Sequence, residues 1–329
     1  MSIDVRKIAP QSDEYKRCID RSPQSTIFHD SDFLKLMAKH SDTELTILAG
    51  FKGQEPVGVF PFYREKKWMM NIVYSPPPGC GVAYLGPVLL NFEKLKRRKV
   101  ERRHKAFVEG CIQWINDEIS PEYVRVRTTT DYNDSRPFQW KNTKSSPRYT
   151  YGLNLNSDEE EIKQSFSKSL RRYLDPDGDQ SIEVNVGGEK EIEFVYGQIN
   201  ARYEAQDKTY PLTESFVKDV YDVLPSERVQ PYVGRVEGEL TAGIITLEDE
   251  SASYFWQGGG KPDTEYPIND LLHWQIIRDS IESDLDYYDL YGANTERICK
   301  YKAKFNSSLQ EYYELERDTP VSKLYKLIQ

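Results

Sequence analysis

The order of predicted helices and strands repeats in the two halves of this chain. In each half, an early helix is followed by two apolar runs typical of a β-hairpin, then by a later helix and a further strand. Glycines lie at matching places in the two hairpins, Gly53 with Gly58 and Gly238 with Gly243. Strands that alternate with helices predict mixed sheets flanked by helices, a layered α/β fold. We therefore expect a duplicated α/β unit.

The boundary between the halves falls in a loop rich in Asn, Asp, Ser and Pro, residues 131–147. A length of 329 residues suits two domains of ordinary size, and we expect them to span residues 1–148 and 149–329. Hydrophobic residues make up 38% of the chain and aromatic residues 12%. This apolar content is sufficient for packed cores and excludes global disorder.

Acidic residues outnumber basic ones, with 53 Asp and Glu against 44 Lys and Arg and a net charge of -9. This balance disfavours broad coating of nucleic acid or of an anionic membrane, because such binding requires clustered cations. A local exception is the basic run 94–105, where eight of 12 residues are Lys or Arg. The run suits a tRNA or a phospholipid-linked substrate, although a solvated helix face is its more common role.

Cysteine usage and missing motifs exclude several kinds of site. The four cysteines form no C-x-x-C pair and only four histidines accompany them, so neither a metal site nor a disulfide framework is expected. No stretch approaches the roughly 20 apolar residues of a membrane span, and the first residues lack an apolar leader core, so we expect a cytoplasmic protein. The P-loop, G-x-G-x-x-G, H-E-x-x-H and G-x-S-x-G motifs are missing, which disfavours nucleotide kinases, dinucleotide oxidoreductases, zincins and serine hydrolases.

The second half contains a more specific pattern. A predicted strand over 252–257 ends in glycines ahead of a predicted helix over 268–281, and a later strand, 287–291, ends in Asp-Leu-Tyr-Gly. This arrangement predicts two strands that separate to form a cleft, and glycines allow a substrate backbone or a phosphate to approach closely.

Several motifs in this half resemble those of the FemAB-like branch of the GNAT superfamily, which comprises peptidoglycan aminoacyltransferases and related N-acyltransferases. They are Leu271-Leu272-His-Trp274, Tyr288-Asp289-Leu290-Tyr291-Gly292 and Tyr301-Lys302-Ala-Lys-Phe305-Asn306. Lys168-Ser-Leu-Arg-Arg172 agrees as well, and further matches in the same order extend the resemblance over about residues 20–317.

The resemblance implies two tandem GNAT-like domains, with the main substrate cleft in the second. It also implies acyl transfer to an amine, without a tightly bound cofactor and with aminoacyl-tRNA or an acyl-CoA as co-substrate. The Q/R-x-x-G-x-G/A motif that binds the CoA pyrophosphate is missing before Ile268, which disfavours acetyl-CoA. The long helical arm of some Fem members is missing too, because no sustained heptads occur.

Two residues are candidate catalytic groups. Lys302 matches the lysine that acts on the donor side in the family, and a fixed cation there stabilises the oxyanion formed when an amine attacks an ester or thioester. Asp289 could accept a proton from the attacking amine, although a structural carboxylate that holds a loop is an equal alternative.

Basic and aromatic residues are candidates for substrate binding. Arg171 and Arg172 suit a phosphate or a tRNA backbone. The resemblance places Arg202 and Tyr203 on the helix that reaches the acceptor.

Four aromatic residues complete the candidate binding set. Tyr254 and Trp256 alternate with Phe255 and share one face of their strand, where they line either the cleft or the core. Tyr291 shares a strand face with Asp289, and Phe305 belongs to the motif that contains Lys302, so both aromatic residues are expected at the cleft.

The sequence therefore predicts an N-acyltransferase that moves an acyl or aminoacyl group onto an amine of a cell-envelope glycan or peptide precursor. Neither a nucleophile nor its base is evident, so direct attack without a covalent intermediate is expected. One alternative is an acetyl-CoA-dependent N-acetyltransferase of an amino sugar or small amine. Another is a non-catalytic protein that binds an anionic glycan or nucleic acid.

Overall fold

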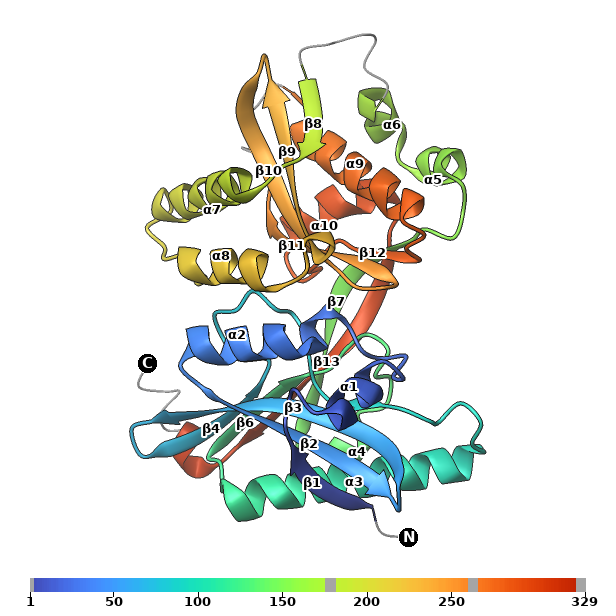
Figure 1. Ribbon diagram of the computed structural model, residues 1–329, viewed down its shortest axis with the longest axis vertical. Helices are drawn as coiled ribbons and strands as arrows, with labels where there is room; N and C mark the ends of the chain where they lie inside the picture. Colours follow the sequence, from blue (N-terminus) through green and yellow to red (C-terminus); the bar gives the residue numbers. More distant parts are fainter. Residues whose placement is uncertain (1–2, 175–181, 260–265, 324–329) are drawn as a thin grey trace. The chain divides into compact units, whose positions relative to one another are not determined.

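A computed structural model describes residues 3–174, 182–259 and 266–323. The chain divides into two compact units: unit 1 comprises residues 1–148 and 311–329, and unit 2 comprises residues 149–310. Both units layer helices on a mixed sheet, so the predicted α/β fold class is confirmed (Figure 1). The segment Asp175-Pro-Asp-Gly-Asp179, whose proline and glycine predict the end of a helix, lies outside the described residues.

The sheet of unit 1 has the strand order β1-β2-β3-β4-β6-β13, and the short β5 pairs with β3. Adjacent strands are antiparallel, except that β4 and β6 are parallel. The strands are β1 (Asp4–Ile8), β2 (Glu44–Lys52), β3 (Glu55–Lys67), β4 (Met70–Ser75), β5 (Val88–Leu89), β6 (Tyr123–Arg127) and β13 (Ser308–Asp318). The α-helices are α1 (Asp13–Ile19), α2 (Ser31–Ser41), α3 (Arg97–Glu118) and α4 (Arg136–Gln139), and a 3-10 turn covers Ile27–His29.

Helices α2 and α3 cover opposite faces of this sheet (Figure 1). Phe60 and Phe62 of β3 belong to the core cluster that includes Phe107 of α3, whereas the Tyr63 hydroxyl donates to the Leu34 main-chain oxygen of α2. Alternate residues of a strand point to opposite faces, so the apolar run in β3 supplies both cores.

The sheet of unit 2 has the order β7-β12-β11-β10-β9-β8. Its neighbours are antiparallel, except that β11 and β12 are parallel. The strands are β7 (Lys144–Asn154), β8 (Ile182–Val186), β9 (Val229–Val236), β10 (Glu239–Glu248), β11 (Ala252–Gly258) and β12 (Tyr287–Asp289). The α-helices are α5 (Glu159–Ser165), α6 (Lys168–Leu174), α7 (Glu189–Glu204), α8 (Glu214–Val223), α9 (Ile268–Glu282) and α10 (Glu296–Lys302), and 3-10 turns cover Ser226–Arg228 and Ala303–Phe305.

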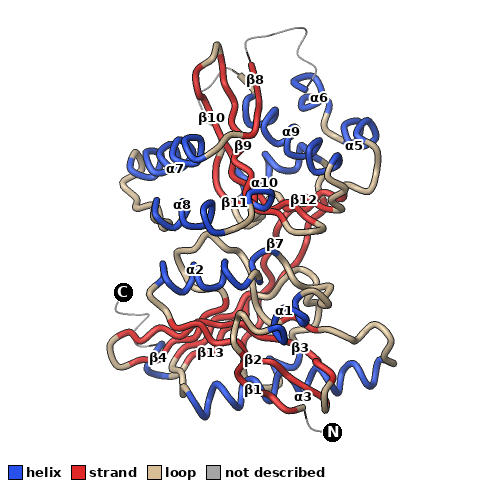
Figure 2. Tube along the Cα trace, in the orientation of Figure 1, coloured by secondary structure: helices blue, strands red, loops and turns tan. Residues whose placement is uncertain are grey.

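Helices α7 and α9 lie on opposite faces of the unit 2 sheet (Figure 2). A Cβ atom built on Gly243 would lie 2.3 Å from Val195 of α7, and one on Gly234 would lie 2.4 Å from Ile268 of α9. These glycines therefore let both helices approach the sheet closely, which a larger residue would prevent.

The two units repeat one succession of strand pairings: four antiparallel strands, a parallel pair, and a final antiparallel strand. β13 takes the last place in unit 1, and β7 takes it in unit 2. The expected second domain ended at residue 329, but residues 311–329 group with unit 1. The reason is the pairing of β13 with β6, from Glu314 opposite Arg127 to Asp318 opposite Tyr123.

Within the described ranges, no helix is both long and apolar enough to cross a membrane.

Candidate functional site

The parallel strands β11 and β12 part after three residue pairs. Their pairing ends with Tyr254 opposite Asp289. Beyond this point β11 continues beside β10 as far as Gly258, while the chain after β12 turns through Tyr291 and Gly292 with φ values of 57° and 66°. The Leu290 amide donates instead to the Tyr151 main-chain oxygen of β7. The two strands thus separate, as the sequence predicted, and among the described residues the edge of β11 that faced β12 has no strand partner beyond Tyr254.

Lys302, at the end of α10, is directed toward this separation and is only 7% exposed. Its Nζ atom donates to the Gly292 main-chain oxygen at 3.1 Å and lies 5.6 Å from the centre of the Phe255 ring. Burial lowers the pKa of Lys302 to about 8, and the charge of Asp289 partly opposes that fall. A desolvated ammonium with donors left over after one hydrogen bond is suited to stabilise a developing negative charge.

Asp289 fixes the turn that receives the Lys302 hydrogen bond. One carboxylate oxygen of Asp289 accepts from the Thr150 hydroxyl at 2.7 Å and from the Tyr291 amide at 2.6 Å. The Gly292 amide in turn donates to the Thr150 hydroxyl at 3.1 Å. Asp289 is 1% exposed, so this geometry favours the alternative of a structural carboxylate.

An aromatic layer lies behind Lys302. His273 stacks on Phe255 with ring centres 5.7 Å apart, and Phe305 meets the imidazole edge-on at 5.2 Å. Burial, followed by the charges of Lys302 and Lys304, lowers the pKa of His273 to about 3, so the imidazole is neutral at physiological pH. Phe305 is fully buried, which makes it a packing residue beneath the lysine.

Phe255 was not among the residues that the sequence predicted for the site. The signal was present, because the alternation that puts Tyr254 and Trp256 on one face puts Phe255 on the other. Trp256 is 1% exposed and packs edge-on against Phe216, while the Tyr254 hydroxyl donates to Asp249 at 3.1 Å. Tyr254 and Trp256 therefore lie in the core, which is one of the two locations that the sequence allowed.

The far end of β11 gathers other predicted residues. An Arg202 guanidinium nitrogen lies 3.5 Å from the Gly258 main-chain oxygen, and the Tyr203 ring lies 5.1 Å from that of Tyr210. Burial raises the pKa of Tyr210, and among its neighbours the phenols of Tyr203 and Tyr291 raise it further. The structure thus brings Arg202, Tyr203 and Tyr291 into one neighbourhood, where they remain predicted binding residues.

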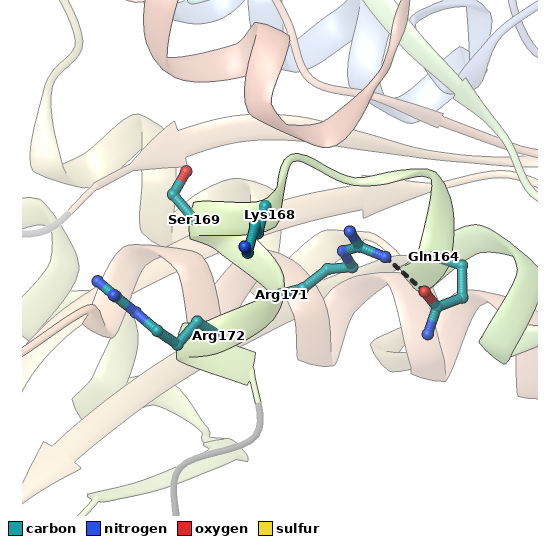
Figure 3. Close-up of a pocket in the computed structure, with 5 residues that line it drawn as sticks. All are labelled: Gln164, Lys168, Ser169, Arg171 and Arg172. Atoms are coloured by element: carbon teal, nitrogen blue, oxygen red, sulfur yellow. Dashed lines mark hydrogen bonds between the residues drawn. The ribbon is translucent and has the colours of Figure 1, made fainter.

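A basic cavity of about 660 Å³ opens on α6 (Figure 3). The Arg171 guanidinium donates to the Gln164 side-chain oxygen at 2.5 Å, whereas the Arg172 side chain extends in the other direction. The segment before α6 is anchored near the lysine motif, because the Ser167 amide donates to the Lys304 main-chain oxygen at 2.9 Å. The lining residues are Gln164, Lys168, Ser169, Arg171 and Arg172.

The basic run 94–105 begins three residues before α3 and continues through the first turns of this helix. Arg103 is buried and forms a bidentate pair with Glu55 at 2.8 and 3.1 Å, and Arg97 pairs with Glu101 at 3.1 Å. Some cations of this run thus have structural partners, while Lys94 and Lys96 are exposed. In the described ranges, no group of three or more His, Cys, Asp and Glu side chains is placed to hold a metal ion.

Comparison with known proteins finds one domain family whose model matches a segment of unit 2. Residues 162–303 match the model of the family described as Acetyltransferase (GNAT) domain. The matched segment contains β11, β12 and Lys302. No curated protein matches the chain in sequence.

Solved structures share the fold over nearly the whole chain. The crystal structure of FemX is 11% identical, with a TM-score of 0.72 over 99% of each chain. The C-terminal domain of a putative lysylphosphatidylglycerol synthetase from Agrobacterium fabrum is 11% identical, with a TM-score of 0.57 over 95% of each chain. A tandem GNAT protein from the clavulanic acid biosynthesis pathway is 10% identical, with a TM-score of 0.53 over 96% of this chain and 98% of that one. The predicted FemAB-like, tandem GNAT resemblance is confirmed at the level of fold, and with the domain match the chain is an acyltransferase.

Proposed function

From the GNAT domain in unit 2, we propose that this chain transfers an acyl or aminoacyl group to the amine of a cell-envelope glycan or peptide precursor. The observation that carries the proposal is the desolvated Lys302 ammonium at the separation of β11 and β12. The resemblance to peptidoglycan aminoacyltransferases and the shared fold with FemX support the choice of acceptor.

The proposed reaction is direct aminolysis. The acceptor amine attacks the carbonyl carbon of the donor, a C–N bond forms, and the C–O or C–S bond to the carrier breaks. The amine loses one proton and the departing hydroxyl or thiol gains one, so no net proton is consumed. Lys302 donates a hydrogen bond to the oxyanion of the intermediate, a contribution of roughly 3 kcal/mol when a single such donor is removed.

We assign Asp289 a positioning role in this reaction. Its carboxylate holds the turn whose Gly292 oxygen orients the Lys302 ammonium, and its charge keeps the lysine protonated to higher pH. Both effects act on the reaction through Lys302 and require no contact between Asp289 and the substrate.

The basic cavity on α6 supports a phosphate-bearing donor. Arg171 and Arg172 face a space large enough for a phosphate group and its neighbours. Aminoacyl-tRNA and acyl-CoA both carry phosphates, so the cavity suits either donor. Arg202 and Tyr203, at the far end of β11, are then the proposed contacts to the acceptor.

Acetyl-CoA is the second candidate donor, and specific observations favour it. The matching family model describes an acetyltransferase, and one of the proteins of similar fold is a tandem GNAT protein from the clavulanic acid biosynthesis pathway. Against it stands the missing pyrophosphate-binding motif before Ile268.

The deciding experiment compares transfer from a charged aminoacyl-tRNA pool and from acetyl-CoA to a UDP-linked amino-sugar peptide. Lys302→Ala is the test variant. Lys300→Ala is the matched control, because Lys300 lies on the same helix, is exposed and pairs with exposed Glu296. We expect transfer from aminoacyl-tRNA that Lys302→Ala reduces about 10²- to 10³-fold and Lys300→Ala leaves unchanged.

Ligand binding measured in parallel separates the alternatives. A bound donor raises the melting temperature, since it stabilises the folded chain by RT ln(1 + [L]/Kd). Transfer and stabilisation with acetyl-CoA alone would show that the donor is acetyl-CoA and not aminoacyl-tRNA. Binding without turnover of either donor, unchanged in Lys302→Ala, would instead support the non-catalytic alternative.

A further inference from the structure

The turn between β3 and β4 exposes two large apolar side chains. Lys67 pairs with Met70 in the strand register, so Trp68 and Met69 form a two-residue loop. Trp68 is 89% exposed and Met69 is 97% exposed. Single exposed apolar residues are common on protein surfaces, but two adjacent large apolar side chains that are both almost fully exposed at the tip of a hairpin are unusual.

Other two-residue hairpin turns in the chain show that such a turn can form without apolar residues. Gly53 and Gln54 connect β2 to β3, and Glu237 and Gly238 connect β9 to β10. All four of these turn residues are exposed, and each turn includes a glycine with positive φ. The Trp68–Met69 turn instead places a tryptophan at a φ of 60°, a conformation in which glycine or asparagine costs less. An apolar pair at such a position has no structural benefit that a polar turn would lack.

Cations lie directly behind the apolar pair. Residues 64–67 are Arg, Glu, Lys and Lys, three cations against one carboxylate, although the whole chain has a net charge of -9. The Arg64 guanidinium is bound to the Asn71 side-chain oxygen at 2.7 Å, whereas Lys66 is exposed. The tip of this hairpin therefore carries two exposed apolar side chains, and the strand residues that precede them carry a net positive charge.

From this arrangement we propose that the Trp68–Met69 turn inserts into the headgroup region of a bilayer that contains anionic lipids. Tryptophan is enriched at membrane interfaces, and lysines close to the surface are attracted to anionic headgroups. Trp68 and Met69 together offer on the order of 400 Å², about half of what one partner contributes to a standard protein interface, which favours a lipid surface over a protein. Because the rest of the chain is acidic, we expect attachment through this tip alone. The proposal depends on neither Lys302 nor the acyl donor.

The test is flotation of the full chain with vesicles of about three parts phosphatidylcholine to one part phosphatidylglycerol. The test variant is Trp68→Gly with Met69→Asn, which we expect to lower the vesicle partition coefficient about tenfold or more. Lys66→Gln should lower it about fivefold, since one lysine near an anionic surface contributes about 1 kcal/mol. Trp140→Ala is the matched control, because Trp140 is 52% exposed in the same unit and should not affect binding.

Thermal unfolding of the same variants keeps the test interpretable. Glycine at the positive φ of residue 68 should leave the melting temperature unchanged or higher, so lost flotation would not reflect unfolding. Should the double variant misfold, Met69→Asn alone provides the same comparison at a position without positive φ. Absence of flotation by the wild type, equal flotation of wild type and variant, or equal binding to pure phosphatidylcholine would each overturn the proposal.

Discussion

The Nζ atom of Lys302 donates a hydrogen bond of 3.1 Å to the main-chain oxygen of Gly292. Burial of this ammonium lowers the pKa of Lys302 to about 8. The Lys302 charge is thus maintained at neutral pH at a cost to the stability of the fold. This relationship makes the proposed chemistry accessible to measurements of both stability and activity.

We expect Lys302→Met to stabilise the folded chain at neutral pH. The pKa of an unfolded lysine is about 10.4, so between about 8 and 10.4 the unfolded chain binds more protons than the folded one. The destabilising effect of Lys302 is therefore complete below pH 8 and disappears as the pH rises through this window. Chemical denaturation at pH 7 should show the variant more stable by roughly 1–3 kcal/mol, with a difference that shrinks above about pH 8. A difference independent of pH would contradict the shifted pKa.

Asp289→Asn should move the alkaline limb of the rate profile to lower pH. The Asp289 charge raises the pKa of Lys302, so its removal leaves less ammonium at any pH near 8. The matched control is Asp286→Asn, because Asp286 is exposed just before the same strand. The measurement is kcat against pH for the wild type and both variants. An equal loss of rate at every pH would show that Asp289 acts through structure alone.

Replacing Arg171 and Arg172 by alanine should weaken donor binding. Phosphate contacts that are equal in the ground and transition states affect KM and leave kcat unchanged, so the donor KM should rise about tenfold or more. The dependence of KM on salt should also become shallower. Arg297→Ala serves as the control, since Arg297 is an exposed residue of α10 outside the cavity. A fall in kcat at constant KM would place the arginines nearer to the reacting atoms.

Two glycine substitutions should change stability in opposite directions. A Cβ at Gly58 would lie 2.7 Å from the Phe107 ring and 2.9 Å from the Val88 main-chain oxygen, so Gly58→Ala should destabilise by about 1–3 kcal/mol. A Cβ at Gly197 in α7 meets no atom within 4 Å, so Gly197→Ala should stabilise by about 0.5–1 kcal/mol. Urea unfolding of the two variants measures both changes, and destabilisation by Gly197→Ala would show that α7 is not a regular helix in solution.

Local sequence was sufficient to predict the elements around the candidate site. Lys302 was expected nearby because its motif resembles that of the FemAB-like family. The glycine-ended strand and the Asp-Leu-Tyr-Gly turn predicted that β11 and β12 separate. These features depend on strand alternation and on backbone conformations with positive φ, which neighbouring residues largely determine. The alternation of Tyr254, Phe255 and Trp256 likewise showed which side chains share a face.

Tertiary structure alone decided which of those faces meets Lys302. Tyr254 and Trp256 enter the core, and Phe255 lies against the lysine, because packing on α8 and α9 selects between two faces that the strand itself leaves equivalent. Tertiary structure also assigned β13 to unit 1 through the pairing of Glu314 with Arg127. Sequence periodicity identifies a strand but not its distant partner, since pairing depends on contacts that form only when remote parts of the chain meet. The same long-range folding buries the Lys302 ammonium, and burial is what lowers its pKa.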